Sequence, residues 1–262
     1  MRSLTFPIGS LLILLALPSH ALAESFKCGS FPLLDDTIPK EERADRLLKR
    51  AVACVQEGKP MESISLFSEL IGLDPNNEAA YLNRGNAYLQ TGQFELGLAD
   101  YSHVIAKNPG LFQSWYNRGT AFVAARQYDR AIADLTEAIR LEPDEARAYC
   151  NRGMSYLRKS DYEKALADLS EGIAKDATLA LCYYARGDLY LSTAKYQEAV
   201  ADLTHGLRLK PTVDGHIQRA RALEQLCETQ DALADYMAAL ALDPLSNAAR
   251  SGAQRLSEGK AP

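Results

Sequence analysis

The sequence has 262 residues, of which 47% are hydrophobic and 24% are charged, and its formal net charge is −5. These fractions match an ordinary globular protein. The negative net charge disfavours a nucleic-acid or anionic-lipid ligand, because both need a concentrated basic surface. We therefore expect no nucleic-acid partner. The net charge is an average over the whole chain, so the alternative of a local basic patch stays open.

Residues 1–23 have the pattern of a signal peptide. Arg2 supplies a positive charge, residues 8–17 are largely apolar, and Ala21-Leu22-Ala23 presents small residues where a signal peptidase cuts. The apolar run is too short to span the roughly 30 Å of a bilayer core. We expect cleavage after Ala23, no stable membrane insertion afterwards, and an exported protein that is periplasmic or secreted.

Cysteines behind this cleavage site would meet an oxidising compartment. They are Cys28, Cys54, Cys150, Cys182 and Cys227. Their odd number leaves at least one without a partner in the chain. The predicted disulfide is Cys28–Cys54, which would join the N-terminal segment to the first helix. The alternative is that all five are small core residues. None has metal-ligand spacing, so we expect no zinc and no cofactor.

Residues 24–43 are predicted to be irregular, because prolines, Gly29 and the Asp35-Asp36-Thr37 cluster favour turns. Pro39 and the acidic residues after it also suit a helix start. From Ala44 helical periodicity continues almost to the end of the chain. The final segment, residues 245–262, is predicted to be a capping helix and a tail.

Residues 44–244 contain a phrase that recurs with a period of 33 or 34 residues, which is the signature of a repeat protein. Asn117-Arg118-Gly119 has copies at Asn83-Arg84-Gly85 and Asn151-Arg152-Gly153, and weaker copies follow at 185–187 and 218–220. Six repeats result, with the boundaries 44–77, 78–111, 112–145, 146–179, 180–212 and 213–244.

Each repeat is predicted to form two helices. In the first helix, large residues at positions four and eleven flank a Gly or Ala at position eight, so one face can receive the second helix closely. In the second helix, a small residue is followed four positions later by a large one on the same face. A proline, which cannot continue a helix, closes each repeat except the fourth, where Ala177 stands instead.

This pattern of large, small and aromatic positions with a closing proline resembles the tetratricopeptide repeat family over about residues 44–244. The resemblance implies an all-α fold, a right-handed α-solenoid superhelix of six antiparallel helix hairpins plus a C-terminal capping helix. A cap is expected because each repeat buries its face only against a neighbour.

Two charged positions recur in step, an Arg at position seven and an Asp sixteen residues later. We predict that each Arg pairs with the Asp of its own repeat or of an adjacent one, since a guanidinium can donate two parallel hydrogen bonds to a carboxylate. The alternative is a row of basic groups for an anionic ligand. The expected structural pairs are Arg84 and Asp100, Arg118 and Asp134, Arg152 and Asp168, Arg186 and Asp202, and Arg219 and Asp235.

Position six is expected to face the concave surface. Some members of the family hold the backbone of an extended peptide with an asparagine ladder, and Asn83, Asn117 and Asn151 match its position. The alternative is that these amides only solvate the inner helices. The predicted peptide-binding residues are Asn83, Asn86, Tyr116, Asn117, Arg147, Asn151, Arg158 and Tyr184.

A second binding mode of the family, the carboxylate clamp that grips chaperone C-termini, is disfavoured. Two of its cationic positions hold Leu82 and Asn151 here. There is also no phosphate-binding Gly loop and no paired His spacing, so we expect no enzyme. The predicted function is a protein-binding scaffold of the cell envelope with a concave groove for a peptide or helix. Alternatives are a self-assembling, homo-oligomeric module and a regulator that docks a folded envelope enzyme.

Overall fold

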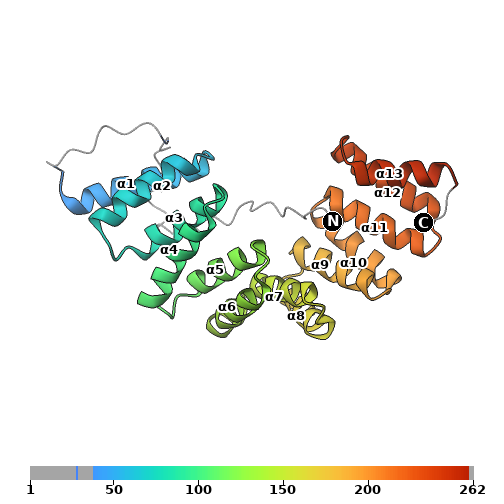
Figure 1. The fold of residues 1–262 in the computed structure, drawn as a ribbon, viewed down its shortest axis with the longest axis horizontal. Helices are drawn as coiled ribbons and strands as arrows, with labels where there is room; N and C mark the ends of the chain where they lie inside the picture. Colours follow the sequence, from blue (N-terminus) through green and yellow to red (C-terminus); the bar gives the residue numbers. More distant parts are fainter. Residues whose placement is uncertain (1–27, 29–37, 260–262) are drawn as a thin grey trace. The chain divides into compact units, whose positions relative to one another are not determined.

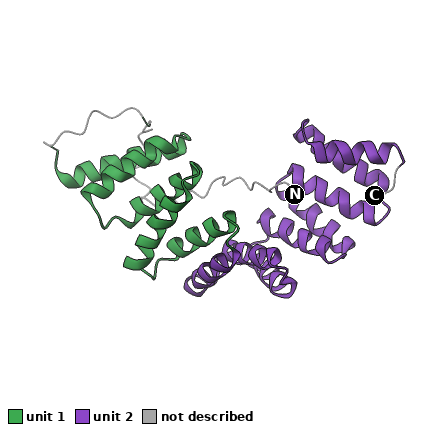
Figure 2. Ribbon diagram, viewed as in Figure 1, with its two compact units in different colours: residues 1–127 green, residues 128–262 purple. Residues whose placement is uncertain are grey.

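The computed structural model describes residue 28 and residues 38–259. The predicted signal peptide, most of the N-terminal segment and residues 260–262 lie outside this part. Within it the chain forms thirteen helices and no strand, divided between two compact units, residues 1–127 and 128–262 (Figures 1 and 2). We describe each unit by itself.

Unit 1 contains two complete helix hairpins and one further helix. Its helices are α1 Lys40–Gln56, α2 Pro60–Leu73, α3 Glu78–Gln90, α4 Phe94–Lys107 and α5 Phe112–Ala124. Unit 2 begins with a single helix, continues with three hairpins and ends with one more helix. Its helices are α6 Tyr128–Leu141, α7 Ala146–Arg158, α8 Tyr162–Lys175, α9 Ala180–Ser192, α10 Tyr196–Leu209, α11 Val213–Gln225, α12 Thr229–Leu242 and α13 Asn247–Ser257.

The turn between the two helices of a repeat contains one residue in the left-handed region. Its φ is 69° at Gly58 and 78° at Gly92, the two turn glycines of the first hairpins. The equivalent residues of the later repeats also have positive φ although they carry side chains: Arg126, Ser160, Ala194 and Cys227. The backbone geometry of the turn is thus kept where the glycine is lost, at a local conformational cost.

Helix α1 begins at Lys40, so the irregular segment predicted to reach residue 43 ends by Pro39. Glu41 and Glu42 lie in the first turn, where acidic side chains favour the positive end of the helix dipole. The proline and the two acids therefore start the helix before the hydrophobic repeat pattern does.

Cys28 is anchored to α1 by three interactions. It forms a disulfide with Cys54, its amide donates to Glu57 Oε1 (2.7 Å), and its carbonyl accepts from Arg50 Nε (3.1 Å). Cys28 is 5% exposed and lies in a core cluster with Leu47 and Phe67 of the first hairpin. This residue thus belongs to the core of the first repeat.

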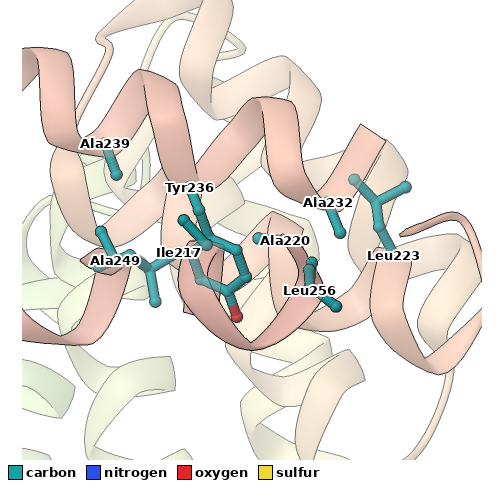
Figure 3. Packing of buried hydrophobic residues seen from close by; sticks show 9 residues of the cluster. Ile217, Ala220, Leu223, Ala232, Tyr236, Ala239, Ala249 and Leu256 are labelled. Atoms are coloured by element: carbon teal, nitrogen blue, oxygen red, sulfur yellow. The ribbon is translucent and has the colours of Figure 1, made fainter. Parts of the chain in front are cut away.

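The C-terminal helix α13 closes the last hairpin. Side chains from α11, α12 and α13, among them Ile217, Tyr236 and Ala249, meet in one apolar cluster (Figure 3). Within it Glu224 accepts hydrogen bonds from Tyr236 Oη (2.6 Å) and from Arg255 Nη2 (2.8 Å). Burial, together with the bond to Glu224, raises the pKa of the Tyr236 hydroxyl. A buried polar network accordingly supplements the apolar contact of the cap.

The small residue at position eight brings the two helices of a hairpin together. A Cβ added to Gly85 of α3 would lie 2.6 Å from Cε1 of Tyr101 in α4, and the Tyr101 side chain is fully buried. A methyl group at this position has no room unless the two helices separate.

We therefore expect Gly85→Ala to lower the free energy of unfolding by about 1–3 kcal/mol, the usual effect of overpacking a core. Gly72→Ala in α2 is the matched control, because nothing lies within 4 Å of its added Cβ. Replacing a helical glycine there should raise stability by about 0.5–1 kcal/mol. Urea denaturation of the two variants measures the difference, and a Gly85→Ala protein as stable as the parent contradicts the packing.

Candidate protein-binding site

Arginines at position seven form two parallel hydrogen bonds with the aspartate of their own repeat. Arg152 donates from Nε (2.7 Å) and Nη2 (2.8 Å) to the two oxygens of Asp168. The same geometry occurs between Arg84 and Asp100, Arg186 and Asp202, and Arg219 and Asp235. These four aspartates are 3–7% exposed. The hydrogen bond that each of the four arginines donates to its aspartate raises the pKa of that arginine.

The third pair is divided between the two units, since Arg118 lies in α5 and Asp134 in α6. Asp134 is 5% exposed, like its equivalents. The pairing of these two residues stays a prediction.

Each of these arginines also reaches the preceding repeat. Arg152 Nη1 donates to the Thr136 hydroxyl of α6 (3.1 Å) and Arg186 Nη1 to the Ser170 hydroxyl of α8 (3.1 Å). The other acceptors are Ser68 for Arg84, Ser102 for Arg118 and Thr204 for Arg219. One guanidinium thus connects the second helices of two successive repeats.

These hydroxyl groups are not among the predicted residues, although the sequence contains a signal for them. A Ser or Thr follows the large residue of the second helix in the first five repeats, and the sixth has Met237. In α13 the residue equivalent to the arginine is Ala253. The hydroxyl and the arginine are therefore lost together at the last junction.

The asparagine series is more deeply placed than expected. Asn117 and Asn151 are 4% and 5% exposed, so neither presents an open amide to a peptide backbone. Asn83 is partly buried, and its Nδ2 donates to the Ala79 carbonyl of its own helix (2.8 Å). Helix α3 packs on α5 in unit 1, and α7 packs on α9 in unit 2, so a short amide does not reach beyond these packed first helices. An open three-rung ladder is thus not what the structure shows.

Three other predicted binding residues take part in packing. Asn86 accepts a hydrogen bond from Tyr101 Oη (2.6 Å) within one hairpin. Tyr116 is 2% exposed and stacks on Phe112 of the same helix. Tyr184 is partly buried and donates from Oη to the Lys210 carbonyl (2.5 Å), and burial raises the pKa of its hydroxyl. These polar tips satisfy partners inside the fold.

Arg147 and Arg158 do lie exposed, at the two ends of α7. Arg158 Nη1 forms an ion pair with Asp188 Oδ2 of α9 (3.0 Å). Asp176 has a lowered pKa because of hydrogen bonds from Thr178, and the positive charge of Arg147 lowers it further. The two arginines are the predicted binding residues that remain open to solvent.

Arg221 of α11 is a third exposed arginine on a first helix of unit 2, and it is not among the predicted binding residues. It stands at position nine, the same position as Asp188 of α9, so the signal was the common register of the repeats. Helices α7, α9 and α11 pack on one another in series. We call their exposed side the unit 2 face, defined by Arg147, Arg158, Leu181, Asp188, Leu191 and Arg221.

A shallow cavity of about 230 Å³ lies in unit 1 beside α3 and α4. It is lined by Asn76, Glu78, Tyr81, His103, Val104 and Lys107. The His103 ring stacks on Tyr81 with 4.1 Å between the centroids, and no Ser or Cys lines the cavity. Among the described residues no group of three His, Cys, Asp or Glu side chains is arranged to hold a metal ion. None of the helices in residues 38–259 has the length and apolar character needed to cross a membrane.

The fold defines a helix-hairpin repeat protein. Family comparison agrees, because the tetratricopeptide repeat description matches residues 48–111, 116–180 and 180–213, which is more than half of the chain. The chain belongs to the tetratricopeptide repeat family. Proteins of this family generally act in protein–protein interaction and are typically non-catalytic scaffolds. No curated relative matches the sequence.

Solved structures with the same fold are distant in sequence. PilF of Pseudomonas aeruginosa is 16% identical with a TM-score of 0.71, and the match covers 84% of this chain and 99% of PilF. In the Cut9–Hcn1 tetramer of the APC/C the identity is 17%, the TM-score 0.75 and the coverage 82% of this chain but only 43% of the other. A thermophilic protein of the same family from Thermus thermophilus is 23% identical over 69% of this chain and 98% of its own, with a TM-score of 0.58. These matches support the fold alone.

We expect Arg152→Leu to destabilise the protein by about 3 kcal/mol or more, because it leaves the buried Asp168 carboxylate without its cation. The double variant Arg152→Leu/Asp168→Leu should regain most of this loss, since a removed pair leaves no buried charge. Arg147→Leu is the control on the same helix and should change stability by less than about 0.5 kcal/mol, as exposed substitutions do. Thermal and urea unfolding of the three variants decide, and equal stabilities for Arg152→Leu and Arg147→Leu contradict a structural pair.

Proposed function

We propose that this protein is a non-catalytic scaffold that binds another protein through the unit 2 face. The observation that carries this proposal is the contrast between two sets of arginines. Those at position seven have their charge used inside the fold, whereas Arg147, Arg158 and Arg221 stand on the exposed side of three packed first helices. Arginine is one of the residues enriched at protein–protein interfaces.

The chemistry of this face indicates the partner. Arg147 and Arg221 are exposed cations, Arg158 is partly neutralised by Asp188, and Leu181 and Leu191 offer apolar contact. A segment with an acidic group and large apolar side chains complements such a face. Because Asn151, the asparagine of the series in unit 2, is buried, recognition rests on side chains of the partner more than on its backbone. The proposed binding surface is therefore the unit 2 face, a smaller region than the concave groove expected from the sequence.

Two other functions remain distinct from this one. A self-assembling module would bind a second copy of the chain, and a regulator would bind the folded surface of an envelope enzyme. Self-assembly would use a face other than the unit 2 face. A folded enzyme would cover a larger surface than an extended segment does. The mass of the purified protein, measured by light scattering, distinguishes self-assembly from the proposed scaffold. A self-assembling module is oligomeric by itself, whereas the scaffold proposed here is monomeric without its partner.

We expect a photoreactive amino acid at position 147 to crosslink the partner in the envelope fraction. The same group at Lys164, exposed on the second helix α8, is the control and should give little product. Arg221→Glu should weaken capture by about tenfold, the effect of roughly 1.4 kcal/mol of binding free energy. Equal crosslinking from positions 147 and 164, or capture that is indifferent to the charge at 221, would contradict the unit 2 face.

We also propose that the protein is exported, on the signal-peptide pattern of residues 1–23. N-terminal sequencing of the protein isolated from the envelope should give Glu24 as its first residue. Ile13→Arg, which places a charge in the apolar run, should leave the uncleaved chain in the cytoplasm. A mature protein that still begins at Met1 would contradict export through this signal.

A further inference from the structure

The structure contains a second disulfide in addition to the predicted Cys28–Cys54 bond. Cys150 of α7 and Cys182 of α9 are bonded, with 5.2 Å between their Cα atoms, and both residues are fully buried. The bond joins the first helix of the fourth repeat to the first helix of the fifth. It closes a loop with a sequence separation of 32 residues, which contains the whole second helix α8.

The next junction uses the same two positions without a covalent bond. Tyr184 is the equivalent of Cys150 (150 + 34), and Gly215 is the equivalent of Cys182 (182 + 33). A Cβ added to Gly215 would lie 2.5 Å from Tyr184 Cε1, so the tyrosine ring packs directly on this residue. The Tyr184 hydroxyl also donates to the Lys210 carbonyl. The disulfide therefore occupies a contact between first helices that is made by packing at the α9–α11 junction.

The bonded junction is also the one that lacks its proline. Ala177 stands between α8 and α9 where the other repeats close with Pro75, Pro109, Pro143, Pro211 and Pro244. Proline restricts the turn because it fixes φ. Its loss gives the α8–α9 turn more freedom in the unfolded chain. The disulfide spans this turn and restores a constraint at the place where the local one is missing.

We propose that the Cys150–Cys182 disulfide is a redox-sensitive strut that holds the α8–α9 junction closed. A dithiol reduces it by thiolate attack on one sulfur: the S–S bond breaks, both cysteines become thiols, and the reductant becomes a cyclic disulfide. Reduction removes the constraint on the loop, so the junction opens more often. Since both sulfurs are buried, the reductant reaches them only when the junction is already open.

The strut affects the unit 2 face, and this consequence rests on the proposed function. The ion pair between Arg158 and Asp188 connects the same two helices, α7 and α9. An open junction separates these side chains and removes the fixed spacing of the face. Reduction is then expected to weaken partner binding, and oxidation to restore it.

The test uses the full mature chain with Cys227→Ser, because Cys227 is a free, exposed thiol that would exchange with the disulfides. Hydrogen exchange is followed by mass spectrometry with and without dithiothreitol, once peptide mapping has established the bond. We expect amides of the α8–α9 turn and the start of α9 to exchange on the order of a hundredfold faster after reduction. The α10–α11 junction is the internal control and should not change. Equal exchange at the α8–α9 junction in the two redox states overturns the strut.

Two variants separate this bond from the other disulfide. Cys150→Tyr/Cys182→Gly copies the Tyr184–Gly215 contact and should be insensitive to reductant at the α8–α9 junction, whereas Cys28→Ala/Cys54→Ala should keep the full response. If the first variant does not fold, Cys150→Ser/Cys182→Ser should show the reduced exchange pattern under oxidising conditions. A response that is lost in the Cys28→Ala/Cys54→Ala protein overturns the proposal.

Crosslinking from position 147 supplies a separate readout. A fall in product on reduction supports control of binding by the strut, and unchanged product overturns that control even if exchange responds. Absence of any crosslink in both redox states contradicts the proposed function and leaves the exchange result standing by itself.

Discussion

In four of the first helices, α3, α7, α9 and α11, a single guanidinium bonds to the second helix of its own repeat and to that of the preceding repeat, and this pair of contacts fixes how the two repeats align. Arg152 holds both oxygens of Asp168 in its own repeat and the hydroxyl of Thr136 in the preceding one. Burying such a pair offsets much of its attraction by desolvation. Its effect is therefore on geometry: a repeat that rotates or slips loses donors and acceptors that no apolar contact replaces. Apolar packing supplies the cohesion, and the guanidinium selects one register.

Much of this fold could be predicted from the sequence, because its determinants recur at fixed positions. Two features follow from the repeat period and helix geometry alone: the close approach of the two helices at Gly85, and the pairing of Arg84 with Asp100. The hydroxyl acceptors were overlooked because a Ser or Thr on an outer helix face looks the same as a solvated residue. The partner of Cys150 was not predictable, because the contact between neighbouring first helices is visible only in three dimensions.

For the candidate site, the sequence did not predict which side chains are exposed. The sequence indicates which side of a first helix a residue occupies, but its exposure depends on the length of the side chain and on the packing of the next first helix. Asn117 and Asn151 are covered, while Arg147 and Arg221 extend into solvent. A long side chain at a neighbouring position can therefore be the better candidate, even where a short one matches a motif of the family.

At the last junction Met237 stands in place of the hydroxyl residue and Ala253 in place of the arginine, so the series of repeats has a direction. Each inner repeat carries a donor that points to the repeat before it and an acceptor for the repeat after it. A tandem duplication of an inner repeat in frame regenerates both bonds at the new junction without any further mutation. A copy of the final repeat inserted behind itself cannot, because Met237 offers no acceptor to the arginine that follows. A repeat added behind the last one would thus pack without the bond that the inner junctions share.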